Sequence, residues 1–83
     1  MTTTTPSPEQ SARKLLSIFA EKNIRAGEIL MAGHVQMAFQ RDTRFRASDY
    51  SAGAQYAHER NWLQFSATTV KLLEEGAEEA MRS

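Results

Sequence analysis

The stretch that decides the fold is "DYSAGAQYAHERNWLQFS", residues 49–66, because the spacing of its small and apolar residues changes partway along it. In its first part these residues recur at the i, i+3, i+4, i+7 spacing of one helix face: Tyr50, Gly53, Ala54 and Ala57. From Trp62 onward the period is two, which is typical of a strand. We therefore predict a helix over residues 48–61, closed by Asn61 in the left-handed conformation, and a strand directly after it.

The start and the inner face of this helix have their own signals. Ser48 is the predicted N-cap, and Asp49 suits the positive end of the helix dipole. Three of the four inner-face residues are Gly or Ala, so we expect this helix to lie close to its neighbours.

A β-hairpin and an acidic helix are predicted after Asn61. Leu63 and Phe65 point to one side of the first strand, and Val70 and Leu72 answer them across a turn at residues 66–69. The stretch "LLEEGAEEAM" predicts a last helix, in which Gly76 costs about 1 kcal/mol relative to Ala. Its expected docking residues are Leu73, Ala77, Ala80 and Met81.

Two amphipathic helices are predicted before residue 48. The first covers residues 8–22, with Ser7 as N-cap, Gln10 as its capping-box partner and a stop at Asn23. Its apolar stripe consists of Ala12, Leu15, Leu16 and Phe19. The second covers residues 32–41, on the spacing of Met31, Val35, Ala38 and Phe39.

Gly27 and Gly33 mark the segment between these helices as a connector. Within it, Ile29 and Leu30 fit either a short strand or a helix. Met31, Met37 and Met81 are interpreted as core-filling residues.

Length and composition indicate one ordinary globular domain. The chain has 83 residues, of which 41% are hydrophobic and 24% charged. We expect a disordered Thr-rich tail over residues 1–7 and a single domain over residues 8–83. No apolar run approaches the roughly 20 residues that cross a bilayer, and the first ten residues lack the pattern of a secretory signal. We therefore expect a cytoplasmic protein that does not contact membranes.

Charge is balanced in total but uneven along the chain. Ten Lys and Arg face ten Asp and Glu, whereas dedicated nucleic-acid binders are usually more basic. Residues 13–46 nevertheless hold seven basic and three acidic side chains. Residues 71–83 hold four Glu against Lys71 and Arg82, so the last helix is acidic.

Signals of catalysis and metal binding are weak. The chain has no Cys, no P-loop, no Gly-x-Ser-x-Gly and no His-Glu-x-x-His. Neither His34 nor His58 has an acidic residue or a second His at i+4 that would make a metal site. Glu74 and Glu78 share a helix face, but that face is expected to be solvated. We therefore expect a protein that is not an enzyme and uses neither metal nor cofactor.

Three helices closed by a hairpin resemble small bacterial winged helix-turn-helix domains, over roughly residues 10–76. The resemblance rests on Tyr50-x-x-Gly53-x-x-Tyr56-Ala57, Asn61-Trp62-Leu63, Val70-x-Leu72 and Gly76. Asn61 stands where such domains often have Gly, and the wing is shorter than usual, with Lys71 as its one base. The expected fold is mainly α with a short β-hairpin, namely a winged-helix-like three-helix core plus a C-terminal helix.

The resemblance implies a small DNA-binding protein, a transcriptional regulator or accessory factor, with helix 48–61 in the major groove of double-stranded DNA. On that helix, Gln55 can pair with adenine, and Ser51 can contact a base or a phosphate. Arg41, Arg44 and Arg46 precede the helix and would hold phosphates, with Lys71 on the wing.

The simpler interpretation is that these candidate DNA-binding residues are ordinary solvated surface residues, with Tyr56 covering an edge of the core. The alternative function is a protein–protein interaction module of the same shape that does not bind DNA. Zero net charge, Glu59 on the same helix face and the acidic last helix favour that alternative. The acidic helix also suits a homodimer or a basic protein partner.

Overall fold

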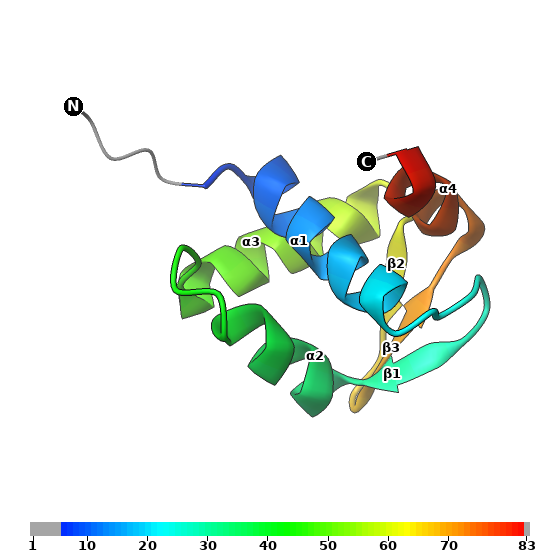
Figure 1. Ribbon diagram of the computed structural model, residues 1–83, viewed down its shortest axis with the longest axis horizontal. Coiled ribbons are helices and arrows are strands. Elements are labelled where there is room, and N and C mark those ends of the chain that lie inside the picture. The colour runs from blue at the N-terminus through cyan, green and yellow to red at the C-terminus, as the bar shows by residue number, and fades with distance from the viewer. Residues whose placement is uncertain (1–5, 83) are drawn as a thin grey trace.

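The computed structural model describes residues 6–82, which form four helices around one side of a small antiparallel sheet (Figure 1). The predicted disordered tail over residues 1–7 lies mostly outside these described residues. In chain order the elements are α1 (Pro8–Glu21), β1 (Ile29–Met31), α2 (Ala32–Gln40), α3 (Ala47–Glu59), β2 (Leu63–Phe65), β3 (Thr69–Leu72) and α4 (Glu74–Arg82).

Helix α1 begins and ends where its sequence signals predict. The hydroxyl of Ser7 accepts from the backbone N–H of Gln10 at 3.1 Å, and the Gln10 side chain accepts from the backbone N–H of Ser7 at 2.8 Å. This reciprocal pair is the predicted capping box. Asn23 lies just beyond the helix with φ of 56°, the left-handed conformation that ends helices.

Helix α3 begins one residue earlier than predicted, and its N-cap is Arg46 rather than Ser48. The carboxylate of Asp49 accepts the backbone N–H of Arg46 at 2.8 Å, as a residue in the first helical turn does in a capping box. Ser48 is therefore an exposed residue of the first turn, and its prediction as N-cap is wrong. At the other end Asn61 has φ of 60°, so its left-handed conformation is confirmed.

Gly53 sets the distance between α3 and α1. It is buried against α1, and a Cβ at this position would lie 2.7 Å from the Cβ of Ser11 and 2.9 Å from the backbone N of Ala12. The predicted close approach of the small-residue face, which also includes the buried Ala57, is therefore confirmed.

The sheet has the strand order β1-β3-β2, with both pairs antiparallel. Leu63 pairs with Leu72 and Phe65 with Val70, as the hairpin pattern predicts. The stretch around Ile29 and Leu30 is the third strand and not a helix, because it finds a partner in β3 about 40 residues later in the chain.

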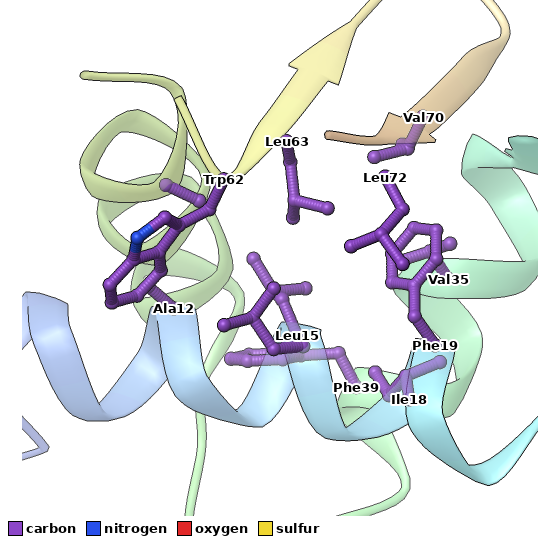
Figure 2. Close-up of a cluster of buried hydrophobic side chains, with 12 residues drawn as sticks. Ala12, Leu15, Ile18, Phe19, Val35, Phe39, Trp62, Leu63, Val70 and Leu72 are labelled. Atoms are coloured by element: carbon purple, nitrogen blue, oxygen red, sulfur yellow. The ribbon is translucent and has the colours of Figure 1, made fainter. Parts of the chain in front are cut away.

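The core lies between α1 and the inner face of the sheet (Figure 2). Leu63, Val70 and Leu72 project from the strands toward Leu15 and Phe19 of α1 (Figure 2). The remaining buried apolar residues complete this cluster: Ala12, Leu16, Ile18, Val35, Phe39, Ala57 and Trp62.

The interpretation of three methionines as core-filling is wrong. Met31 is 51% exposed, Met37 60% and Met81 87%. Met31 lies in β1 and not in the helix, so the period of two turns it outward while Leu30 turns inward. Met37 lies on the solvent side of α2, and Met81 does not dock the last turn of α4 as predicted.

Two glycines have roles that the sequence patterns did not indicate. Gly33 lies inside α2 and does not punctuate the connector. Gly76 is buried, and a Cβ there would collide with the carbonyl group of Trp62. That carbonyl accepts the backbone N–H of Leu73 at 3.0 Å, so the start of α4 is held against the segment between α3 and β2. Gly76 therefore permits the docking of α4.

Candidate nucleic-acid interface

The outer face of α3 is polar and open. Ser51 and Gln55 are exposed on it, and Ala52 between them is half-buried. Glu59 is also exposed, and its carboxylate accepts from the side-chain amide of Gln55 at 3.4 Å. Glu59 therefore lies one turn from the predicted base-reading residue and contacts it.

Three exposed arginines lie in or beside the connection that leads into α3, but one of them is paired. Arg44 donates to the Asp42 carboxylate, with a closest distance of 2.7 Å. Its guanidinium also lies 5.7 Å from the ring centroid of Phe45. Hydrogen bonding to Arg44 holds the pKa of Asp42 well below its usual range, with a smaller effect from Lys14 at 3.6 Å.

Arg41 and Arg46 differ from Arg44 in this respect. Within residues 6–82 neither side chain forms an ion pair, and both residues are exposed. Arg46 stands at the N-cap of α3, where the helix dipole adds to its positive charge. Arg46 therefore stands beside the buried Asp49 carboxylate of the first turn of α3, and Arg41 at the C-cap of α2 adds a second unpaired guanidinium.

The C-terminal half of α3 is covered on one flank by aromatic packing. The ring of Tyr56 meets the ring of Trp62 edge-on, with centroids 5.5 Å apart, and the guanidinium of Arg60 lies 4.8 Å from the Tyr56 centroid. Trp62 in turn has the guanidinium of Arg13 over its ring at 5.3 Å. Tyr56 thus covers an edge of the core, as the simpler interpretation of the sequence predicts.

The start of α1 borders the same outer face. A shallow hollow of about 300 Å³ is lined by Pro8 together with Ala52, Gln55, Tyr56 and Glu59. Sequence reasoning missed this proximity. The small residues at the crossing of α1 and α3 were the only signal that could have indicated it.

Lys71 stands apart from the arginines. It is exposed on the outer face of the sheet, opposite Ile29 of β1 and Gln64 of β2. The turn at residues 66–68 is uncharged, and the carbonyl of Thr68 accepts the backbone N–H of Ala32 at 2.8 Å. The tip of the hairpin is therefore tied to the start of α2 and brings no basic side chain of its own.

Charge is separated along the molecule. The connection between α2 and α3, with Arg41, Arg44 and Arg46, lies at one end of the long axis (Figure 1). Helix α4, with exposed Glu74, Glu75 and Glu78, lies toward the other end (Figure 1). A polyanion would therefore be attracted to the arginine end and repelled from the α4 end.

No three His, Asp or Glu side chains among residues 6–82 gather in a way that could hold a metal ion. None of the described helices has the length and apolar character needed to cross a bilayer. Comparison with protein families, with curated proteins and with solved structures finds no match to this chain.

Proposed function

We propose that this protein binds double-stranded DNA as a winged-helix module, with α3 in the major groove. The order of its elements supports this proposal, since a helix, a strand and two helices are followed by a two-stranded hairpin. The sheet order β1-β3-β2, with both pairs antiparallel, also fits a winged helix-turn-helix arrangement.

The observation that carries the proposal is the combination of surfaces on α3. Its outer face is polar and partly lined by small residues, which allow close approach to a groove. Arg46 at its N-cap and Arg41 at the C-cap of α2 form no ion pair within residues 6–82, and both can hold phosphates beside that groove. Gln55 is then placed to read an adenine edge, and Ser51 a base or a phosphate.

The expected affinity is modest. With Arg41, Arg46 and a partly neutralised Arg44, one copy makes about two to three phosphate contacts. The logarithm of the binding constant should therefore fall with the logarithm of salt concentration with a slope of about −2 to −3. A protein that binds this weakly as a single copy would act as an accessory factor or as a regulator that binds in more than one copy.

Fluorescence anisotropy with a mixed-sequence duplex tests the proposal at low salt. Arg46→Glu should weaken binding by about tenfold or more, because it replaces a phosphate contact with repulsion. Arg25→Glu is the matched control, since Arg25 is exposed on the connector after α1 and away from α3. Absence of binding at about 50 mM salt, or equal loss in both variants, would refute the proposal.

Binding to duplexes of different sequence distinguishes residues that contact bases from residues that contact phosphates. Gln55→Ala should change the order of preference among duplexes with little change in mean affinity, whereas Arg46→Glu should weaken binding to all of them. If Gln55→Ala leaves the order of preference unchanged, α3 does not read bases through this residue.

One observation favours the second candidate, a protein-interaction module without DNA binding. Glu59 lies on the outer face of α3 and contacts Gln55. If α3 enters a DNA groove, this carboxylate repels phosphates, and Glu59→Gln should strengthen DNA binding severalfold at low salt. If the variant gains no affinity and the parent protein does not bind DNA, the interaction module is the better proposal.

A further inference from the structure

An apolar groove lies between the end of α1 and helix α4. Its volume is about 590 Å³, and Met81 on its wall is 87% exposed. The other apolar side chains around it include Ala20, Ile24, Ala26, Leu72 and Ala77. A hollow of this size beside an open methionine can accept more than one apolar side chain from outside.

The rim of the groove along α4 is acidic. Advancing about 100° per residue around the helix places Glu74 and Glu78 just outside Met81, whereas Glu75 points away from the groove. Glu79 is occupied, since it accepts from Arg13 at 2.9 Å and from Arg82 at 3.3 Å. Arg25 lines the opposite wall of the groove. An occupant that lies over α4 must therefore bring positive charge.

This charge argues against simple pairing of two α4 helices. Such a contact would bring Glu74 and Glu78 of both copies together, and like charges across an interface are costly. Arg82 is the one basic residue of α4 and is already paired with Glu79.

The complementary surface is present on the same chain. A second hollow, of about 260 Å³, is lined by Lys22, His34, Met37, Ala38 and Arg41. Met37 is 60% exposed there, so an open methionine is surrounded by basic side chains. The nearby Asp42 is already engaged by Arg44 and Lys14.

The two hollows are neighbours on either side of the C-terminal end of α1. Ala20 and Asn23 border the α4 groove, and Lys22 borders the Met37 hollow. A two-fold axis through this end of α1 would therefore place each groove opposite the other copy's Met37 hollow. In such a dimer the groove of each copy meets the Met37 hollow of the other, so no surface is left to bind a third copy.

We propose that the occupant of the α4 groove is a second copy of this chain, which inserts Met37 and pairs Lys22 and Arg41 with Glu74 and Glu78. The contact forms reciprocally and yields a closed dimer. The contact takes up Arg41, so that side chain cannot hold a phosphate in the dimer, and dimer formation competes with DNA for it.

Sedimentation of the full chain without DNA tests the proposal. The average mass should rise from 9.3 kDa toward twice that value. The rise should occur between about 10 μM and about 1 mM protein, and growth should stop at the dimer. A mass that stays at the monomer value, or one that rises past the dimer, would overturn the proposal.

Charge reversal locates the surfaces. The acidic-rim variant, Glu74→Lys with Glu78→Lys, and the basic-hollow variant, Lys22→Glu with Arg41→Glu, should each weaken self-association by about tenfold or more. An equimolar mixture of the two variants should restore a dimer, because both reciprocal contacts then join opposite charges.

Matched controls separate this contact from general charge effects. Glu59→Lys with Glu75→Lys and Arg60→Glu with Lys71→Glu make the same charge changes on exposed positions outside the two hollows. Both controls should dimerise like the parent protein. Failure of the mixed variants to associate, with circular dichroism showing both folded, would overturn the assigned surfaces.

Discussion

Replacing Gly53 by Ala tests whether the close approach of α3 to α1 determines the stability of the domain. The added Cβ would lie 2.7 Å from the Cβ of Ser11, 2.8 Å from the Ser11 carbonyl carbon and 2.9 Å from the backbone N of Ala12. None of these atoms is the free end of a long side chain. The two helices must therefore move apart to admit one carbon atom.

The magnitude follows from two opposing effects. Alanine is favoured over glycine inside a helix by about 1 kcal/mol. An extra carbon in a packed interior costs about 1–3 kcal/mol, and the cost is higher where the backbone must shift. We expect the second effect to prevail, with a net loss of about 2 kcal/mol in the free energy of unfolding. For a domain of this size the melting temperature should then fall by about 10 °C.

Thermal and urea unfolding followed by helical circular dichroism measure this difference. Gly33→Ala in α2 is the matched control, because a Cβ at Gly33 meets nothing within 4 Å. That variant should gain up to about 1 kcal/mol and melt about 5 °C higher than the parent. If Gly53→Ala is as stable as the parent or more stable, the packing of α1 against α3 does not have the role assigned to it.

Four further outcomes can be measured, three by urea unfolding and one by binding to duplex DNA. Ser11→Ala should stabilise the protein by about 1 kcal/mol, because the Ser11 hydroxyl is buried and finds no hydrogen-bond partner within residues 6–82; a lower urea midpoint would contradict this. Gly76→Ala should lower the urea midpoint, since its Cβ collides with Trp62, and an unchanged midpoint would show that α4 docks loosely. Asp42→Asn should strengthen binding to duplex DNA severalfold at low salt, because it releases Arg44, and unchanged affinity would place Arg44 outside the DNA contact. The pKa of Asp42 is lowered by folding, so its stabilising contribution is complete above about pH 4 and is lost as the pH falls toward the folded-state pKa. The urea midpoint of Asp42→Asn should therefore change less than that of the parent between about pH 5 and about pH 2, and equal changes would contradict the pairing.

Local signals predicted the elements whose partners are near in the chain. The capping box of Ser7 and Gln10, the left-handed Asn61 and the pairing of Leu63 with Leu72 each depend on a few neighbouring residues. The period of two in the hairpin also predicted which side chains enter the core. For these elements, short-range geometry and burial act in the same direction.

Contacts between distant segments could not be predicted in this way. Strand β1 exists because β3 pairs with it, and that pairing turns Met31 outward. Gly76 reads as a weak point of a helix until the carbonyl of Trp62 is placed against it. The sequence indicates neither partner.

In the candidate site, too, the features that depend on local spacing could be predicted and those that depend on distant contacts could not. The exposure of Gln55 and Ser51 follows from the helical spacing around Gly53 and Ala57. The engagement of Arg44 by Asp42 depends on how the chain turns between α2 and α3. The proximity of Pro8 to Gln55 depends on the crossing angle of two helices, which residue spacing does not contain.

Trp62 is the one tryptophan of the chain, and its position makes it a natural optical probe. The residue is 6% exposed, its ring contacts Tyr56 and Arg13, and its carbonyl accepts from the backbone N–H of Leu73 at the start of α4. Glu79 of α4 pairs with the Arg13 guanidinium that lies over this ring, so detachment of α4 would free Arg13 and change the surroundings and emission of the indole while α1 to α3 remain helical. Intrinsic fluorescence can therefore follow the last helix separately from the rest of the domain, without any label.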